Sequence, residues 1–369
     1  MVAMIDLIAA ARPNFMKVAP LYKALSAEAG WCRPRLVHTG QHYDANMSDA
    51  FFRDLGLPEP DIHLGVGSGS HAEQTAGVMV AYEKVCLERR PDWVVVVGDV
   101  NSTLACTLAA TKLGIPVAHL EAGLRSRDRT MPEEINRLAT DALADLLWTP
   151  SPDADDNLRA EGVSIDKVER VGNIMIDSLE MMRPEIEVRR FFEALGLPAG
   201  AYGVMTLHRP SNVDDRERLA GLCEVIAGVA QRLPMVFPVH PRTRQRLIAF
   251  GLWDRLAGIK GLRLIEPAGY VDFMSLVFNS RFVLTDSGGV QEETTYLRIP
   301  CLTLRESTER PITVTEGTNR LIKAEGVLAQ VDAILSGGWI SGRVPDRWDG
   351  KTAGRVVASL RARLTGAAG

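Results

Sequence analysis

The sequence lacks the features of a membrane protein, a secreted precursor or a disulfide-bonded domain. No stretch approaches the roughly 18 uninterrupted apolar residues that a membrane-spanning helix needs. The five cysteines are odd in number, widely spaced and without a CxxC pair, which favours reduced thiols over disulfides or a zinc site. The segment MVAMIDLIAA has no basic residues and no cleavage-like site, so we expect a buried strand there rather than a signal peptide. These absences predict a cytoplasmic protein.

An excess of positive charge is also missing. The 42 lysines and arginines are balanced by 46 aspartates and glutamates, and the formal net charge is −4. Such a chain has no overall field that would hold a polyanion. We therefore expect neither a nucleic acid nor a membrane surface as a partner.

Common nucleotide-binding and hydrolase motifs are absent as well. AARPNF follows the first predicted strand in place of GxGxxG, and GVGSGS has Ser70 where the third glycine belongs, which argues against a nicotinamide or flavin enzyme. The segment DGKT is no P-loop, because Pro345 replaces the first glycine, and no GxSxG elbow occurs. His38 and His42 have HxxxH spacing, but Gly40 lies between them and no glutamate follows the first histidine. We therefore expect polar loop residues there rather than a metal site.

Alternating strands and helices are what the chain does contain. Short apolar runs recur, and each is followed by a longer segment with helical periodicity, which is typical of a parallel sheet with helices on both faces. The first series of predicted strands covers residues 3–10, 34–39, 93–98, 115–120 and 146–151. The second series covers residues 203–208, 235–240, 262–267, 282–287 and 299–306. The predicted fold class is α/β, with two doubly wound Rossmann-like domains.

A linker is predicted between the two series, where GNIMIDSLEMMRPEIEVRR places a boundary near residues 172–185. We assign residues 1–175 to an N-terminal domain and residues 176–351 to a C-terminal domain. The helical pattern at 352–369 is expected to cross back onto the first domain. The glycine-rich segment 65–74 is predicted to be a mobile loop.

Carboxylates are predicted to gather at one edge of the first sheet. Asp99 and Glu121 each follow a strand and are 22 residues apart, so two parallel strands would deliver them to the same edge. Glu133 lies at a proline-led helix start, RTMPEEINR. Carboxylates that converge without lysine partners raise one another's pKa and become proton donors or acceptors near neutrality. The alternatives are that Asp99 caps the helix near Asn101 and that Glu133 favours its helix N-terminus.

Cations follow the first strand. Arg12 and Lys17 lie in the opening turns of the next predicted helix, where positive charge opposes the helix dipole. A bound anion explains them better than helix stability does. The alternative is a pair of solvated surface charges.

The second series carries an anion-binding pattern. FVLTDSGGVQEE places Ser287, Gly288 and Gly289 between a strand and a helix, where glycines allow close approach and free N–H groups face a phosphate. A tight turn is the alternative. Glu293, one turn further on, could accept hydrogen bonds from sugar hydroxyls or compensate the helix dipole.

Two histidines, His208 and His240, end strands at equivalent places. Basic residues follow them, which favours a diphosphate in this region. The arginines that follow these two strands and the last predicted strand are Arg209, Arg242, Arg244 and Arg310.

The chain resembles the non-hydrolysing UDP-N-acetylglucosamine 2-epimerases, which have the glycosyltransferase-B fold, with two domains facing a central cleft. The blocks that carry the resemblance span nearly the whole chain in order: ARPNFMKVAP, HTGQHYDANMS, GDVNSTLA, HLEAGLRS, MPEEINR, VGNIMID, LHRPSN, PVHPRT, TDSGGVQEE and STERPITVTEGTNRL. The resemblance implies reversible epimerisation at carbon 2 of UDP-N-acetylglucosamine to UDP-N-acetylmannosamine, through elimination of UDP to a 2-acetamidoglucal and re-addition. It implies no cofactor and no metal, and a homodimer serving cell-surface polysaccharide biosynthesis.

The resemblance also implies site residues. The catalytic set corresponds to Asp99, Glu121, Glu133 and His208. The ligands of the UDP-sugar correspond to Arg12, Lys17, Asp99, Glu121, Arg137, His208, Phe273, Ser287, Gly288, Gly289, Glu293 and Arg310. It places the uracil near 268–273, the diphosphate on the Ser-Gly-Gly turn and the ribose on Glu293, all in a UDP-binding C-terminal domain.

Several positions depart from the family pattern. Ala10 and Ala11 stand where a Gly-Thr pair often precedes Arg-Pro, and Ala268 stands where some members have Gln, so a side-chain contact to uracil is absent. Asp44 and Glu73 replace Gln and Arg at positions that line a second, activating site in some bacterial members. Those two replacements argue against allosteric activation by substrate.

Other functions stay open at this point. Members of the same superfamily act on UDP-2,3-diacetamido glucuronate at the same carbon, and hydrolysing relatives release free N-acetylmannosamine. A glycosyltransferase would share the architecture, and a non-catalytic sensor would bind a UDP-sugar without exchanging the carbon 2 proton. The three predicted carboxylates argue against both of the last two.

Overall fold

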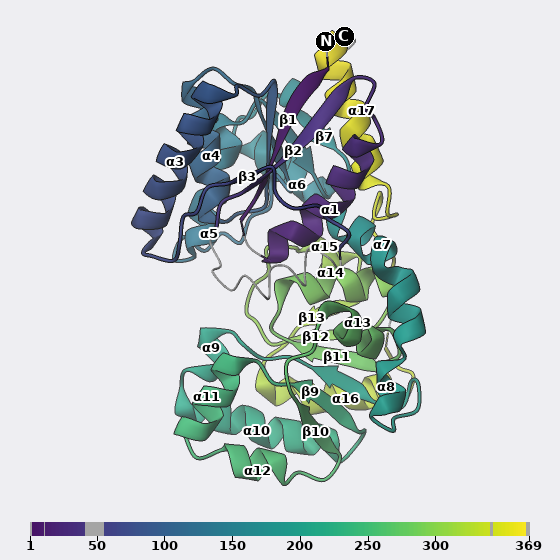
Figure 1. Cartoon of the computed structure of the whole chain (residues 1–369). Coiled ribbons are helices and arrows are strands. Elements are labelled where there is room, and N and C mark those ends of the chain that lie inside the picture. The colour runs from purple at the N-terminus through teal and green to yellow at the C-terminus, as the bar shows by residue number, and fades with distance from the viewer. Residues whose placement is uncertain (1, 11, 41–54, 340–341, 367–369) are drawn as a thin grey trace. The chain divides into compact units, whose positions relative to one another are not determined.

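The computed structural model describes residues 2–10, 12–40, 55–339 and 342–366, which form two compact units (Figure 1). Unit 1 comprises Met1–Met181 and Asp346–Gly369, and unit 2 comprises Met182–Pro345. The chain enters unit 2 within helix α7 (Ile174–Arg189) and returns ahead of helix α17 (Thr352–Thr365). The sequence predicts the two divisions after residues 175 and 351, and each observed division lies six residues from its predicted place.

Unit 1 is built on a seven-stranded sheet with the order β3-β2-β1-β4-β5-β6-β7, in which every neighbouring pair is parallel. The strands are β1 (Ala3–Ala9), β2 (Cys32–His38), β3 (Ile62–His63), β4 (Trp93–Val97), β5 (Val117–Leu120), β6 (Leu146–Thr149) and β7 (Val168–Arg170). Strands β4, β5 and β6 are buried on both faces almost throughout, which explains their unbroken apolar runs. The strand order reverses between β1 and β4, and ligands of such sheets bind beyond the carboxyl ends at this switch point.

Among the described residues, the helices of unit 1 are α1 (Arg12–Ser26), α3 (His71–Glu88), α4 (Asn101–Lys112), α5 (Pro132–Leu143), α6 (Pro152–Ala160), the first part of α7, and α17. The predicted loop over 65–74 is wrong in its last four residues, because α3 begins at His71. Ser70 and Glu73 form a capping box there: Ser70 Oγ accepts from the Glu73 N–H at 3.2 Å, and Glu73 Oε2 accepts from the Ser70 N–H at 2.8 Å.

Helix α17 packs against α1 within unit 1 (Figure 1). The Trp148 indole of β6 donates a 2.9 Å hydrogen bond to Ser359 Oγ of α17, and the Asp177 carboxylate accepts from the N–H groups of Thr352 and Ala353 at 3.1 and 2.8 Å. The carboxylate therefore satisfies two of the free donors at the start of α17. The C-terminal helix is thereby fixed to unit 1 by bonds at both its start and its middle.

Unit 2 contains a six-stranded sheet with the order β10-β9-β8-β11-β12-β13, again parallel throughout. Its strands are β8 (Gly203–Met205), β9 (Met235–Pro238), β10 (Leu262–Ile265), β11 (Phe282–Thr285), β12 (Cys301–Thr303) and β13 (Asn319–Leu321). Its helices are the second part of α7, then α8 (Phe191–Ala194), α9 (Pro210–Val213), α10 (Arg216–Ala230), α11 (Pro241–Ala249), α12 (Trp253–Ala257), α13 (Tyr270–Phe278), α14 (Gly288–Leu297), α15 (Ile312–Thr315) and α16 (Val327–Leu335). The predicted class, α/β with two doubly wound parallel sheets, is confirmed.

The five cysteines are buried free thiols, and burial raises the pKa of the Cys32, Cys86, Cys223 and Cys301 thiols to about 11. In the part of the chain that the structure describes, no helix combines the length and apolar character needed to cross a bilayer.

Candidate functional site

A buried ion pair stands at the switch point of the sheet in unit 1. Lys17, in the second turn of α1, contacts Glu121, which directly follows β5. Lys17 is 8% exposed and Glu121 is 5% exposed. Glu121 has φ +71°, a conformation that costs a residue other than glycine roughly 1–2 kcal/mol. Glu121 is one of five described residues other than glycine with a positive φ, and it is the one among them that is predicted to be catalytic; such strain is common at functional sites.

The turn after β4 fits closely under this ion pair. Gly98 has φ +68°, and a Cβ atom there would lie 3.1 Å from Lys17 Nζ and 3.6 Å from Glu121 Oε2. Asn14 of α1 donates a 2.9 Å hydrogen bond to the carbonyl of Val97. Only glycine combines this conformation with such a close approach.

Asp99, the residue after Gly98, is held by helix α5. Arg137 Nε lies 3.0 Å from Asp99 Oδ2, and Asn136 Nδ2 donates to the Asp99 carbonyl at 2.9 Å. The Asp99 side chain is 31% exposed. The alternative in which Asp99 caps the next helix is wrong, because the N-cap of α4 is Val100 and no side chain caps it.

Glu133 lies in the first turn of α5 and is half-buried. It forms no hydrogen bond or ion pair with any other described residue. Its neighbour Glu134 is buried, contacts Arg137 and accepts hydrogen bonds from the backbone N–H groups of Ser126 and Arg127 at 2.9 and 2.8 Å. Glu134 therefore has a structural role, while the Glu133 carboxylate has no polar partner among the described residues.

The premise that the three carboxylates lie without cationic partners is wrong. Glu121 is paired with Lys17, and Asp99 is paired with Arg137. The pairs join residues 104 and 38 positions apart, so no local pattern indicated them. The backbone of Arg12 lies in the first turn of α1, and its side chain is outside the described part of the structure.

A glycine-rich helix start marks the candidate site of unit 2. Ser287 is the N-cap of α14, but its side chain makes no capping hydrogen bond, so the first N–H groups of this helix suit an anion. A Cβ atom on Gly288 would lie 2.6 Å from Glu309 Oε1, whereas one on Gly289 would meet nothing within 4 Å. A side chain at position 288 would thus have to displace the ion-paired carboxylate of Glu309, whereas position 289 has open space.

Two arginines and a carboxylate cover this helix start. Glu309 lies 3.0 Å from Arg305 Nη2 and 2.7 Å from Arg310 Nη1, and Arg310 Nε lies 2.7 Å from Glu292. Arg310, a predicted ligand, is 9% exposed. Sequence reasoning missed Arg305 and Glu309, although the charge-rich run RESTER contained both.

A buried carboxylate, Asp286, organises the loop that carries His208. Its oxygens accept from the N–H groups of His208 at 3.0 Å and Arg209 at 2.9 Å, from Asn212 Nδ2 at 3.1 Å, and lie 3.0 Å from His208 Nδ1. Burial raises the pKa of Asp286, but the bonds from His208, Arg209 and Asn212 outweigh it, and the net pKa is lowered. Sequence reasoning missed Asp286, which directly precedes the predicted Ser-Gly-Gly turn.

His240 stands beside His208, with their rings 5.5 Å apart. Burial and the neighbouring imidazole of His208 lower the pKa of His240. His240 is also the N-cap of α11, because its Nδ1 accepts from the Arg242 N–H at 3.2 Å. Arg242 pairs with Asp214 and Arg244 pairs with Glu266 at the surface, so these two arginines already have acidic partners.

Glu293 faces Tyr270, whose hydroxyl donates to Glu293 Oε1 at 2.8 Å. Burial raises the pKa of Glu293 to about 7, the charge of Glu292 adds to the rise, and the Tyr270 hydrogen bond opposes it. Glu293 lies beyond the first turn of α14, so helix-dipole compensation is ruled out as its role. Phe273, also predicted as a ligand, lies half-buried on the same helix as Tyr270.

Of the departures from the family pattern, Glu73 has the local role of a capping-box residue, and the Ser70 backbone hydrogen bond lowers its pKa. Asp44 and His42 lie outside the described residues. Ala268 directly precedes Gly269, the N-cap of α13.

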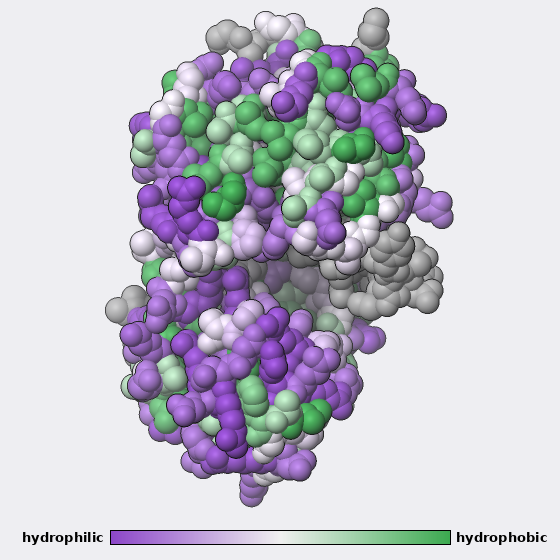
Figure 2. Space-filling model, turned by 90° about the vertical axis from the view of Figure 1, so that its left-hand side faces the viewer, coloured by the Kyte–Doolittle hydropathy of each residue, from purple (hydrophilic) through white to green (hydrophobic). Residues whose placement is uncertain are grey.

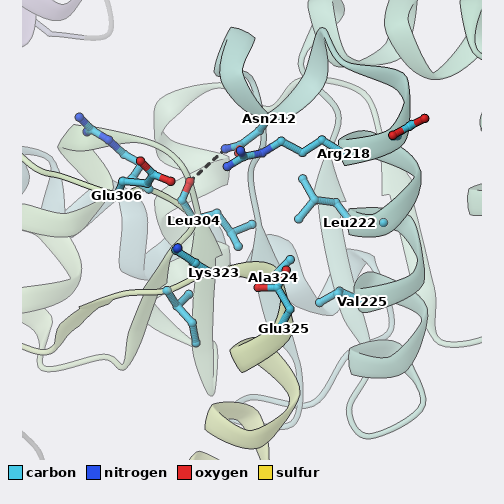
Figure 3. A pocket seen from close by; sticks show the side chains of 13 residues that line it. Asn212, Arg218, Leu222, Val225, Leu304, Glu306, Lys323, Ala324 and Glu325 are labelled. Atoms are coloured by element: carbon cyan, nitrogen blue, oxygen red, sulfur yellow. Dashed lines mark hydrogen bonds between the residues drawn. The ribbon is translucent and has the colours of Figure 1, made fainter.

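A cavity of about 540 Å³ in unit 2 lies between α10 and the segments that follow β12 and β13 (Figure 3). Figure 3 shows Asn212 donating to the carbonyl of Leu304, a bond of 3.0 Å, and Arg218 and Lys323 among the other lining residues. Asn212 also donates to Asp286. None of the predicted UDP-sugar ligands lines this cavity, so the candidate site is not assigned to it.

Comparisons with known proteins identify the family of this chain. The family model described as UDP-N-acetylglucosamine 2-epimerase matches residues 23–361. The chain is 43% identical to the UDP-N-acetylglucosamine 2-epimerase of Methanocaldococcus jannaschii, over 90% of this chain and 92% of that protein. It is 42% identical to the UDP-2,3-diacetamido-2,3-dideoxy-D-glucuronate 2-epimerase of Pseudomonas aeruginosa, over 86% of this chain and 87% of that protein.

A solved structure gives the same result. The crystal structure of the Methanocaldococcus jannaschii UDP-GlcNAc 2-epimerase in complex with UDP-GlcNAc and UDP matches with a TM-score of 0.86 at 40% identity, and the match covers 97% of this chain and 99% of that one. The two parallel sheets thus define an α/β enzyme of the glycosyltransferase-B type. The chain belongs to the UDP-N-acetylglucosamine 2-epimerase family, whose members are isomerases, and the resemblance seen in its motifs is confirmed.

Proposed function

We propose that this chain interconverts UDP-N-acetylglucosamine and UDP-N-acetylmannosamine by inverting carbon 2 of the sugar. The observation that carries the proposal is the strained, buried Glu121 paired with Lys17 at the switch point of unit 1, in a chain of this family. Unit 2 supplies the complementary features of a nucleotide site: an uncapped Ser-Gly-Gly helix start and the buried Glu293.

The chemistry requires an indirect route, because carbon 2 bears an amide nitrogen and has no carbonyl neighbour to acidify its proton. We propose elimination: a carboxylate removes the carbon 2 proton, the bond from carbon 1 to the UDP oxygen breaks, and a double bond forms between carbons 1 and 2. The 2-acetamidoglucal is then protonated at carbon 2 from the opposite face while UDP re-adds at carbon 1. Atoms and charges balance without a cofactor or a metal.

The base and the acid are drawn from Asp99, Glu121 and Glu133. Lys17 pairs with Glu121 and Arg137 pairs with Asp99, whereas Glu133 has no such partner among the described residues. The departing diphosphate would be stabilised by cations and donors aimed at its developing charge. These are Arg12, Lys17, His208, Arg310 and the turn from Ser287 to Gly289.

The nucleotide is proposed to lie on unit 2. The uracil would lie near residues 268–273 beside Phe273, and the ribose hydroxyls would bond to Glu293. The buried Asp286 supports this placement, because it fixes the backbone on which His208 stands. Arg137 completes the proposed substrate contacts through its position against Asp99.

A second substrate has a specific observation in its favour. The Pseudomonas aeruginosa relative named for UDP-2,3-diacetamido-2,3-dideoxy-D-glucuronate is 42% identical, nearly as similar as the relative named for UDP-N-acetylglucosamine at 43%. Incubation of the purified chain with each sugar nucleotide, followed by separation of the products, tests the choice. Epimerisation of UDP-N-acetylglucosamine at the higher kcat/KM is expected. Turnover of the diacetamido glucuronate alone, or release of free N-acetylmannosamine, would overturn the proposal.

A homodimer is also proposed. Val80 and Leu87 of α3 are 51% and 68% exposed, and apolar side chains gather on the face of unit 1 turned to the viewer in Figure 2, the side that carries α3 in Figure 1. Exposed apolar surface of this kind supports a contact with a second copy. The cytoplasmic location stays a prediction from the cysteine pattern.

A further inference from the structure

His119 is a fully buried histidine that the proposed chemistry does not use. It lies on β5, two residues before Glu121, and is 0% exposed. Both of its ring nitrogens have partners: Nδ1 lies 2.6 Å from Asp141 Oδ1, and Nε2 lies 2.8 Å from the carbonyl oxygen of Gly98. Because both ring nitrogens have hydrogen-bonding partners, the chemistry of these partners determines which nitrogens carry a hydrogen.

The contact with Gly98 fixes the first proton. A backbone carbonyl can only accept a hydrogen bond, so Nε2 must carry a hydrogen. If the ring were neutral, Nδ1 would then be a bare acceptor. It would face an oxygen of Asp141 at 2.6 Å, and this contact needs a proton between the two atoms.

The surroundings of Asp141 place that proton on the histidine. The other carboxylate oxygen of Asp141, Oδ2, lies 2.7 Å from Arg125 Nη1 and accepts a hydrogen bond from the Gly123 N–H at 3.0 Å. Two such donors favour the carboxylate. An ionised Asp141 leaves Nδ1 as the donor.

We infer that His119 is an imidazolium, held inside unit 1 by Asp141, and that it is a positioning residue for the catalytic carboxylates. It bonds to the carbonyl of Gly98, and the Gly98 N–H bonds to the carbonyl of Leu120 at 3.0 Å. The peptide backbone at Gly98 is thus bonded to β5 through both its N–H and its carbonyl group.

The position of this peptide connects the ring to the reaction. Gly98 directly precedes Asp99, and its Cα lies against Lys17 and Glu121 so closely that a Cβ there would be 3.1 Å from Lys17 Nζ. The imidazolium therefore fixes the turn that carries Asp99 relative to the strand end that carries Glu121. This inference rests on the proposed function for its catalytic part, whereas the charge on the ring can be measured without any substrate.

The first experiment measures the protons on the ring. The full chain is labelled with ¹⁵N-histidine, and long-range proton–nitrogen spectra are recorded at pH 8 without ligand. Signals that vanish in His119→Gln identify this ring among the seven histidines. We expect both nitrogens of His119 to carry protons at pH 8. A ring with one proton at that pH would overturn the inference.

The second experiment removes the counter-charge. Asp141→Asn keeps the shape of the side chain but cannot hold an imidazolium, so we expect the ring to lose its Nδ1 proton. We also expect kcat to fall roughly ten- to hundredfold, because small displacements of catalytic groups cost this much, while KM and UDP affinity stay within about threefold. Asp145→Asn is the matched control: Asp145 accepts from the Val117 N–H at the opposite end of β5 and should leave kcat unchanged.

The outcomes separate the two claims. A folded Asp141→Asn variant with wild-type kcat would overturn the positioning role of His119. An equal loss of kcat in Asp145→Asn would also overturn it, because the loss would then reflect general stabilisation of β5. If Asp141→Asn does not fold, His119→Gln takes its place, because glutamine can still donate to the Gly98 carbonyl but carries no charge. If the wild-type chain turns over no UDP-sugar, the proposed function fails, and the spectra still decide the charge of the ring.

Discussion

Replacing Glu293 by glutamine should stabilise the free protein at pH 8 and much less at pH 5. Glu293 is 4% exposed, and burial raises its pKa from an ordinary 4.5 to about 7. Between these two values the folded state binds more protons than the unfolded state, so stability falls as the pH rises from 4.5 to 7. Above pH 7 the penalty is fully present, and below 4.5 it is absent.

The size of the effect follows from the same shift. A pKa rise from 4.5 to about 7 corresponds to about 3 kcal/mol of destabilisation above pH 7. A unit of this size gains about 2–4 °C in Tm for each kcal/mol. The glutamine can still accept the Tyr270 hydrogen bond, but its buried NH₂ group costs part of the gain. The difference between the two pH values isolates the charge, because the NH₂ group is present at both.

Thermal unfolding of the wild type and Glu293→Gln at pH 5 and pH 8, without ligand, measures this. We expect the variant to gain several degrees more at pH 8 than at pH 5. Glu325→Gln is the control, since Glu325 is exposed on the same unit and should show no such dependence. Equal shifts of Glu293→Gln at both pH values would refute the argument that burial disfavours this carboxylate.

Further predictions concern Glu121 in unit 1, the glycine turn of unit 2, the need for a metal ion and activation by the substrate. Glu121→Gln should abolish epimerisation while UDP still binds, and it should lower stability towards the low end of about 3–5 kcal/mol because Lys17 loses its charged partner; unchanged turnover in a kinetic assay would refute its catalytic role. Gly288→Ala should lower the Tm, because its Cβ would lie 2.6 Å from Glu309 Oε1, whereas Gly289→Ala should leave it equal or higher; equal losses would contradict the packing argument. Dialysis against EDTA should leave the rate unchanged, and a loss restored by a divalent metal would contradict the metal-free mechanism. Plots of rate against UDP-N-acetylglucosamine should be hyperbolic, and a sigmoidal curve would show that the activating site survives the departure at Glu73.

The fold could be predicted from the sequence wherever strands were long and buried on both faces. Every predicted strand is present, although several are shorter than expected. The three that sequence reasoning missed, β3, β7 and β13, have two or three residues each, and all lie at sheet edges. Their sequences, IH, VER and NRL, contain too few apolar residues to stand out as strands.

The candidate site was predictable in its positions and not in its partners. The rule that ligands bind beyond the carboxyl ends of parallel strands placed Asp99 and Glu121 at the end of the sheet where its strands finish. The structure has both residues there. The rule could not reveal that Lys17 and Arg137 neutralise them, because these contacts arise from the packing of α1 and α5 on the sheet. Asp286 was missed for a related reason: its function is to hold the backbone of a loop 78 residues away.

The most direct test of the central claim is a single incubation in heavy water. The purified chain is mixed with UDP-N-acetylglucosamine in D₂O, and the proton spectrum of the sugar is followed. Epimerisation by proton removal and return predicts loss of the carbon 2 proton signal by exchange for deuterium, together with the appearance of UDP-N-acetylmannosamine. Retention of that proton in all nucleotide sugars, with no second epimer formed, would contradict the account.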